Sequence, residues 1–302
     1  MANNLINIAN APCSWGVLEF ELDGKAPDYV QVLDEMSTIG YTGTELGDWG
    51  FMPTDGAQLR AELEKRQLKM LGGFVGIALA DPETHAAGEA KALDHARLMA
   101  EAAGETPFIV LSDENGIIEE RIRYAGRIRP EHGLTSEQWD TFVNGVHRIA
   151  QAVKDETGLR TVLHPHCAGY IETPEEIDTL MERTDPNLLG LCFDTGHYRF
   201  GGGEPLEAFT RYTDRIWHVH FKDCHPDIAA RSREEGWDYF ESVGKGVFCE
   251  LGKGEVDFLA FIAELRKRNY DGWIVVEQDV LPGMGSPYES AERNLQYLQS
   301  VI

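Results

Sequence analysis

The sequence has little positive charge, and this deficit limits its partners. Lys and Arg number 27 among 302 residues, whereas Asp and Glu number 51, so the formal net charge at pH 7 is −24. A surface this acidic repels the phosphates of nucleic acid and of anionic lipid. We therefore expect neither nucleic acid nor a membrane as a partner.

The sequence also lacks paired cysteine motifs and long apolar runs. Its five cysteines are odd in number and none forms a Cys-x-x-Cys pair, which indicates reduced thiols rather than a disulfide framework. Residues 1–16 contain no basic leader and no continuous apolar segment, so they do not resemble a signal peptide. No stretch approaches the ~20 apolar residues that cross a bilayer. These absences predict a soluble, cytoplasmic protein.

What the sequence does contain is a repeated alternation of apolar runs and amphipathic helical stretches. Several helix starts are well marked, because Thr135, Thr173 and Ser286 are each followed three residues later by Gln or Glu. Eight runs have the character of strands: 6–13, 40–46, 68–76, 107–113, 160–166, 187–194, 215–221 and 272–278. Strands that alternate with helices imply a parallel sheet, and eight such units close a barrel. We predict an α/β fold, a single (β/α)8 TIM barrel over residues 1–302.

Two connections are longer than ordinary strand-to-helix loops. The segments near 114–134 and 223–254 both follow the C-terminal end of a strand. Long loops in a compact domain are usually functional, and the active sites of barrel enzymes lie at this end of the strands. We expect both loops to lie over the mouth of the barrel.

The stretch IWHVHFKD, residues 216–223, combines an apolar strand face with two imidazoles and an ammonium group. Side chains alternate between the two faces of a strand. The face toward the surrounding helices would hold Trp217, Val219 and Phe221. The face toward the lumen would hold Ile216, His218, His220 and Lys222. Other strands end with polar residues on the same expected inward face: Glu45, His164, His166, Asp194 and Glu277.

These residues together predict a divalent metal site, although each has a structural explanation when taken alone. Asp194, for example, could cap a helix. Two carboxylates, Asp194 and Glu277, with His220 and either His164 or His166, suit a borderline metal better than Ca²⁺ or a structural zinc. We expect Mn²⁺ or Co²⁺ first, with Zn²⁺, Fe²⁺ or Mg²⁺ as further candidates.

Other residues at the expected rim are candidates for contacts with the ligands or with a substrate. His197, in the motif DTGH, could orient a metal ligand or touch substrate. Trp15 and Trp49 follow the first and second strands. They belong either to the core or to the apolar walls of a site for a sugar ring. The sequence leaves open whether the chain forms a homo-oligomer.

Several motifs resemble the xylose isomerase-like TIM barrels of sugar isomerases and epimerases, over nearly the whole chain. They are FDTGH, HVHFKD, a strand-end VVE and the segment HPHCAG followed by ET. Longer runs resemble the inosose dehydratase family: APCSWG, TELGDWGF, HPHCAGYIETPEE and YDGWIVVEQD. The resemblance implies metal ligands at Asp194, His220 and Glu277. It also implies His164 as the fourth ligand, where the superfamily usually carries a glutamate that serves epimerases as an acid/base.

The replacement of that glutamate favours a chemistry in which a histidine or lysine moves the proton. The resemblance implies β-elimination of water from a cyclic polyol ketone such as 2-keto-myo-inositol, with the metal stabilising an enolate. We expect His166 or Lys222 to remove the proton, His197 or a metal-bound water to protonate the departing hydroxyl, and Glu45 to contact substrate hydroxyls. The alternatives are a ketose 3-epimerase or aldose–ketose isomerase on the same metal barrel, an abasic-site endonuclease, which the acidic charge disfavours, and a sugar-binding protein.

Overall fold

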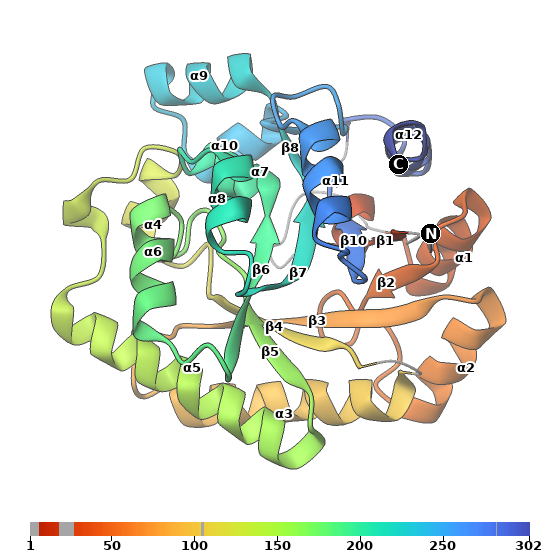
Figure 1. Cartoon of the computed structure of the whole chain (residues 1–302), viewed down its shortest axis with the longest axis horizontal. Helices are drawn as coiled ribbons and strands as arrows, with labels where there is room; N and C mark the ends of the chain where they lie inside the picture. The colour runs from red at the N-terminus through yellow and green to blue at the C-terminus, as the bar shows by residue number, and fades with distance from the viewer. Residues whose placement is uncertain (1–5, 18–26, 104–105, 282) are drawn as a thin grey trace.

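Eight parallel strands form a closed barrel in a computed structural model that describes residues 6–17, 27–103, 106–281 and 283–302 (Figure 1). The barrel order is β1-β10-β7-β6-β5-β4-β3-β2. The strands of the barrel are β1 Asn7–Asn10, β2 Gly43–Glu45, β3 Lys69–Ile77, β4 Phe108–Asp113, β5 Arg160–Leu163, β6 Leu189–Asp194, β7 Ile216–Phe221 and β10 Trp273–Val276. Each lies within or overlaps one of the eight predicted runs, so the prediction of a TIM barrel is confirmed.

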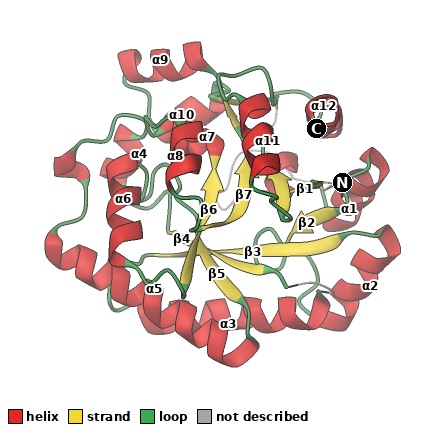
Figure 2. Ribbon diagram, in the orientation of Figure 1, coloured by secondary structure: helices red, strands yellow, loops and turns green. Residues whose placement is uncertain are grey.

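Helices surround the barrel on its outside (Figure 2). Those that follow barrel strands or fill the connections are α1 Tyr29–Ile39, α2 Gly56–Arg66, α3 His85–Ala102, α4 Glu119–Tyr124, α5 Ser136–Thr157, α6 Pro174–Arg183, α7 Thr195–Phe200, α8 Pro205–Arg211, α9 Pro226–Glu235, α10 Tyr239–Gly244, α11 Phe258–Lys267 and α12 Pro287–Val301. Short 3₁₀ turns occupy Pro12–Trp15 and Pro130–His132. No helix among these described residues is long and apolar enough to cross a membrane.

Local sequence signals determine several of the helix starts. The hydroxyl groups of Thr135 and Thr173 accept the backbone N–H three residues on, and Gln138 and Glu176 bond back to complete two capping boxes. Ser286 accepts the N–H of residue 289 at the start of α12. Such caps satisfy donors that the first helical turn leaves free.

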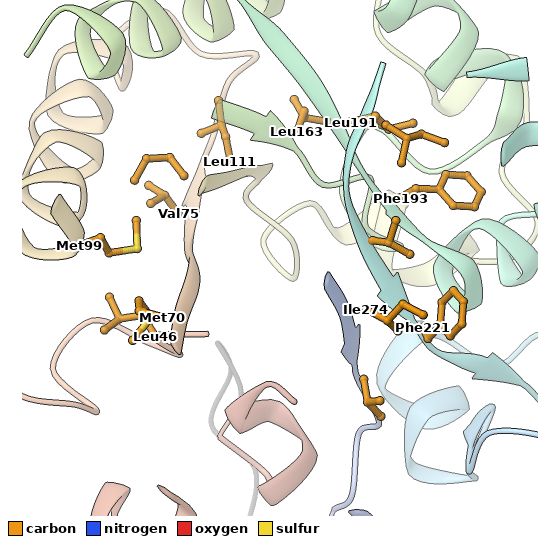
Figure 3. Close-up of a cluster of buried hydrophobic side chains, with 14 of the residues drawn as sticks. Leu46, Met70, Val75, Met99, Leu111, Leu163, Leu191, Phe193, Phe221 and Ile274 are labelled. Atoms are coloured by element: carbon orange, nitrogen blue, oxygen red, sulfur yellow. The ribbon is translucent and has the colours of Figure 1, made fainter. Parts of the chain in front are cut away.

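The barrel strands separate an outer core from a filled lumen. The outer faces pack against the helices in one large apolar cluster, to which Leu111, Leu163, Leu191 and Phe193 contribute (Figure 3). Alternate positions on the same strands form smaller clusters inside the barrel, centred on Ala9, Leu71 and Val275 and on Val110, Val162 and Cys192. The lumen below the site is therefore closed by side chains, as in other barrels of eight strands.

A β-bulge in β7 overturns part of the predicted face assignment. Leu191 pairs with Ile216, but Cys192 pairs with His218, so Trp217 is the extra residue of the register shift. Ile216 joins the outer core, whereas Trp217 packs in the lumen cluster. A bulge places one additional residue on a strand and thereby resets the alternation of side chains. The prediction that Trp217 faces the helices and Ile216 the lumen was wrong.

The two long loops are both structured and contact each other. The first carries α4 and the turn Pro130–His132. The second carries α9, α10 and a two-stranded ribbon of β8 Asp223–Cys224 and β9 Phe248–Cys249. Arg233 Nε donates to the carbonyl oxygen of Gly126 at 2.8 Å, and Arg127 Nη1 donates to that of Trp237 at 2.7 Å. These arginines link one loop to the other.

Candidate metal centre

Four side chains from neighbouring strands converge at the C-terminal end of the barrel. His164 directly follows β5, and Glu277 directly follows β10. Asp194 ends β6, and His220 lies on β7. Each offers one ligand atom, and these atoms lie within 4.8 Å of one another. The structure thus brings together the residues that the sequence analysis proposed as ligands, with His164 rather than His166 in the group.

Several polar atoms in this group make no hydrogen bond to the described residues. Both ring nitrogens of His164, Oδ2 of Asp194 and Nδ1 of His220 are buried and have no hydrogen-bond partner within the part of the chain that the structure describes. The His164 Nε2 to Asp194 Oδ2 distance is 3.7 Å, too long for a hydrogen bond. Unsatisfied buried polar atoms are costly, and one cation among them would satisfy a ring nitrogen of His164, Oδ2 of Asp194 and Nδ1 of His220 together. Two imidazoles and two carboxylates fit a divalent metal such as Zn²⁺, Mn²⁺ or Co²⁺.

Asp194 serves two roles with its two oxygens. Oδ1 accepts the backbone N–H of His197 at 2.7 Å, which makes Asp194 the N-cap of α7. Oδ2 is the oxygen that remains without a partner among the described residues. The structural explanation of this aspartate and the metal-ligand hypothesis are therefore compatible.

The negative charge of Glu277 lies beside two positively charged side chains, His220 and Lys222. Glu277 Oε1 lies 3.2 Å from His220 Nδ1, and its Oε2 lies 3.3 Å from Lys222 Nζ. Burial alone would raise the pKa of Glu277, but His220 and Lys222 hold it well below its ordinary value. Burial alone would lower the pKa of His220, but Cys192, Glu277 and Glu45 raise it well above its ordinary value. A metal ion bound at His220 would displace this proton, because a coordinating imidazole must be neutral.

Lys222 is an ammonium group held by two carboxylates. Besides Glu277, its Nζ lies 3.4 Å from Asp279, and it lies 3.3 Å from His197 Nε2. Burial alone would lower the pKa of Lys222, but Asp279 and Glu277 raise it well above its ordinary value. Lys222 is therefore equipped to donate a proton or to stabilise negative charge, and poorly equipped to act as a base.

His166 and His197 pack against each other beside the four ligand candidates, with ring centroids 3.9 Å apart and the rings tilted by 42°. His166 Nδ1 donates to the carbonyl oxygen of Cys167 at 2.7 Å, which leaves Nε2 as its basic nitrogen. Burial, together with His164 and Lys222, lowers the pKa of His166 well below its ordinary value. Burial, His166 and Lys222 lower the pKa of His197 in the same way. Both rings are therefore neutral near pH 7.

A small cavity of about 50 Å³ opens beside these groups, and His164, His166, His220, Lys222 and Glu277 line it. Phe74 and Tyr239 supply aromatic lining, and Tyr239 reaches the cavity from the second long loop. The sequence analysis did not select several of the lining residues, among them Asp48, Phe74, Tyr239 and Asp279. Asp279 could have been found, because it lies two residues after Glu277 in a strand-like run. Tyr239 had no comparable signal.

The two tryptophans do not line this cavity. Trp15 is 2% exposed and belongs to the outer core, where its Nε1 donates to Glu35 at 2.6 Å. Trp49 is 45% exposed and packs against His95, with ring centroids 4.4 Å apart. Of the two interpretations of Trp15, the core interpretation agrees with its position, and the aromatic lining comes from other residues.

Glu45 lines the cavity, but two histidines are hydrogen-bonded to one of its carboxylate oxygens. Its Oε1 accepts from His218 Nε2 at 2.6 Å and from His220 Nε2 at 2.9 Å. Burial alone would raise the pKa of Glu45, but His220 and His218 lower it to about 2. Glu45 therefore remains a carboxylate, and its Oε1 is already engaged by both histidines.

Comparisons with known proteins identify relatives of this chain. A family model described as xylose isomerase-like TIM barrel matches residues 33–301. An inosose dehydratase of Geobacillus kaustophilus (strain HTA426) is 34% identical over 303 residues, which cover 99% of this chain and 96% of that protein. An inosose dehydratase of Clostridium botulinum (strain Eklund 17B / Type B) is 31% identical over 300 residues, 98% of this chain and 97% of that protein.

The solved structures show the same fold at lower identity. The structure of an IOLI protein with a binding zinc atom matches with a TM-score of 0.73 and 13% sequence identity, over 98% of each chain. At this identity the likeness extends to the fold alone. The family model and the curated relatives carry the assignment, and they confirm the resemblance that the motifs indicated. The chain therefore belongs to the xylose isomerase-like TIM barrel family and is an enzyme related to the inosose dehydratases.

Proposed function

We propose that this enzyme is a metal-dependent dehydratase that eliminates water from a cyclic polyol ketone such as 2-keto-myo-inositol. The observation that carries the proposal is the convergence of four ligand atoms beside a cavity. Three of them, on His164, Asp194 and His220, are buried without a hydrogen-bond partner among the residues described. The curated relatives named as inosose dehydratases indicate the substrate class. Mn²⁺, Co²⁺ or Zn²⁺ is the expected ion.

The metal would be held by His164, Asp194, His220 and Glu277. A divalent cation there would supply Lewis-acid polarisation of the substrate carbonyl, and so would stabilise the negative charge that develops when the neighbouring C–H bond loses its proton. Buried side chains exclude water from this end of the lumen, which strengthens such electrostatic stabilisation.

The proton transfers fall to three groups beside the proposed ligands. His166 is the proposed base, because its ring is neutral and its Nε2 is free of the bond that Nδ1 makes to Cys167. Lys222 is the proposed acid, since an ammonium held between two carboxylates can donate a proton to a departing hydroxyl. His197, 3.3 Å from Lys222 Nζ, is positioned to pass a proton back to it. Of the two bases considered from the sequence, this distribution of charge favours His166.

The reaction itself is the direct test. The purified chain is incubated with 2-keto-myo-inositol and Mn²⁺ or Co²⁺, with and without chelator, and followed by ultraviolet absorbance. Dehydration creates a conjugated enol or a diketone with new absorbance, and chelation should abolish it. A product with the mass of the substrate and no new absorbance would instead indicate epimerisation or isomerisation, and would contradict the proposal.

Variants of the ligands test the metal dependence. We expect His220→Ala and Glu277→Gln to lose metal binding and turnover together, because each removes one of four ligands. Glu207→Gln is the matched control, since it removes an exposed carboxylate on α8. Full activity of either ligand variant without bound metal would contradict the proposal.

A further inference from the structure

One carboxylate oxygen bridges two histidines across the lumen of the barrel. Glu45 ends β2, whereas His218 and His220 lie on β7, and in the barrel order β1 and β10 separate these two strands. Glu45 Oε1 lies 2.6 Å from His218 Nε2 and 2.9 Å from His220 Nε2. All three side chains are at most 5% exposed. Groups more than 170 residues apart in sequence thus meet in a buried contact.

These two contacts determine which nitrogen of His220 is available as a ligand. A carboxylate oxygen only accepts, so each Nε2 carries a hydrogen and donates it. The other nitrogen of His220, Nδ1, lies 3.2 Å from Glu277 Oε1 and has no hydrogen-bond partner among the described residues. Nδ1 is therefore the atom that His220 presents to the group with His164 and Asp194. In metal sites, a carboxylate on the far nitrogen commonly orients the coordinating imidazole.

The surrounding backbone provides space for this carboxylate. A Cβ atom at Gly72 would lie 3.0 Å from Glu45 Oε1. The register between β2 and β3 shifts at Thr44 and Glu45, where Glu45 pairs with Gly72. The bulge at Trp217 likewise precedes His218 in β7. Two irregularities on opposite sides of the barrel accompany the contact, and bulges commonly re-aim side chains near functional sites.

The distances distinguish a hydrogen-bonded triad from a second metal site. Glu45, His218 and His220 also lie close enough together to be considered as ligands of one ion. Ligand atoms at ~2.1 Å from a tetrahedral metal are separated by roughly 3 Å or more. The 2.6 Å between His218 Nε2 and Glu45 Oε1 is shorter than that and corresponds to a charge-assisted hydrogen bond.

We propose that Glu45, supported by His218, is a positioning residue that fixes His220 with Nε2 protonated and Nδ1 directed at the metal, rather than a residue that contacts substrate. This inference rests on the metal site of the proposed function. It predicts that loss of the carboxylate weakens metal binding although no ligand is removed. In Glu45→Gln, an amide oxygen can still accept from both Nε2–H groups, but it carries no negative charge, so His220 is held more weakly in this orientation.

Metal titration of the variants tests the inference. Isothermal titration with Zn²⁺ and the visible absorption spectrum of the Co²⁺ form are compared for wild type, Glu45→Gln and Glu172→Gln. Glu172 is the matched control because it is a buried carboxylate that accepts backbone N–H groups, from Gly126 and Ala168. We expect Glu45→Gln to bind ~10–100-fold more weakly with an altered Co²⁺ spectrum. We expect Glu172→Gln to match wild type in both measurements.

A measurement on the wild-type protein keeps the test decisive if Glu45→Gln does not fold. Long-range ¹H–¹⁵N correlation of the Zn²⁺-loaded protein reports which ring nitrogen of His220 is coordinated and which is protonated. Coordination through Nδ1 with a protonated Nε2 supports the inference. Coordination through Nε2, or wild-type affinity and spectrum in Glu45→Gln, overturns the inference alone. A wild-type chain that binds no divalent metal overturns the proposed function and this inference with it.

Discussion

Replacing Glu172 by glutamine removes a buried carboxyl group that joins the first long loop to the segment carrying His166. Glu172 is 2% exposed. Its Oε1 accepts the N–H of Gly126 at 2.6 Å, and its Oε2 accepts the N–H of Ala168 at 3.0 Å. Ala168 has a positive φ of 70°, so this tight turn depends on its surroundings for support.

The pKa of Glu172 sets the magnitude of the expected effect. Burial raises this pKa from 4.5 to about 7, although Arg121 and the two N–H groups oppose the rise. The unfolded chain releases the proton near pH 4.5, whereas the folded chain keeps it until about pH 7. Between these values the folded state binds more protons, so the free energy of unfolding falls as pH rises. At about 1.4 kcal/mol for each pH unit, the full loss is about 3 kcal/mol, complete above about pH 7.

Denaturant unfolding of the metal-free protein at several pH values from about 5 to about 8 measures this contribution. Glu172→Gln cannot titrate, and it leaves one N–H facing an amide NH₂, which lowers its stability by a constant ~1–3 kcal/mol. We expect the stability advantage of wild type over Glu172→Gln to shrink by about 2–3 kcal/mol across the window. Glu175→Gln, which removes an exposed carboxylate three residues away on α6, should follow the wild-type profile. Parallel profiles for wild type and Glu172→Gln would refute the reasoning.

Three further substitutions test the lumen, the proton donor and the aromatic lining. Gly190→Ala should lower the free energy of unfolding by about 1–3 kcal/mol, because its Cβ would lie 2.3 Å from the Trp217 ring; wild-type stability by denaturant unfolding would contradict the position of Trp217. Lys222→Met should lower kcat by roughly 10²–10⁴-fold while Co²⁺ still binds; unchanged turnover would exclude Lys222 as the acid. Tyr239→Ala should raise KM roughly tenfold with metal affinity unchanged, because it removes an aromatic wall of the cavity but no proposed ligand. Steady-state kinetics and metal titration measure the two effects. An unchanged KM would show that substrate does not contact this ring.

The strand ends of this chain show how much of the candidate site can be predicted from sequence. Asp194, His220 and Glu277 each lie at or near the end of an apolar run, and parallel strands bring such ends to one rim whatever the details of packing. The convergence of these residues therefore followed from the eight-unit pattern. The choice between His164 and His166 did not, because two residues on the same strand face differ only in height, and β5 ends at Leu163 before either of them.

For the two tryptophans and Glu45, the sequence predicted a position near the rim but not the direction or the partners of the side chain. Trp15 and Trp49 both follow barrel strands, but their side chains lie in the outer core and at the surface. Glu45 is a strand-end carboxylate like the ligand candidates, yet its partners come from β7 across the lumen. Which way a rim side chain turns depends on neighbours that are remote in sequence, and no local pattern contains them.

The sequence by itself determined the barrel, its helix starts and the chemical types at its rim, because alternation, capping and strand polarity are local properties that act over a few residues. Only the tertiary structure decided the register. The bulge that turns Trp217 into the lumen arises from pairing between β6 and β7. The same pairing brings His218 and His220 within reach of Glu45. Hydrogen bonds between strands and the packing of a closed lumen are cooperative and non-local, and they set where each functional atom points.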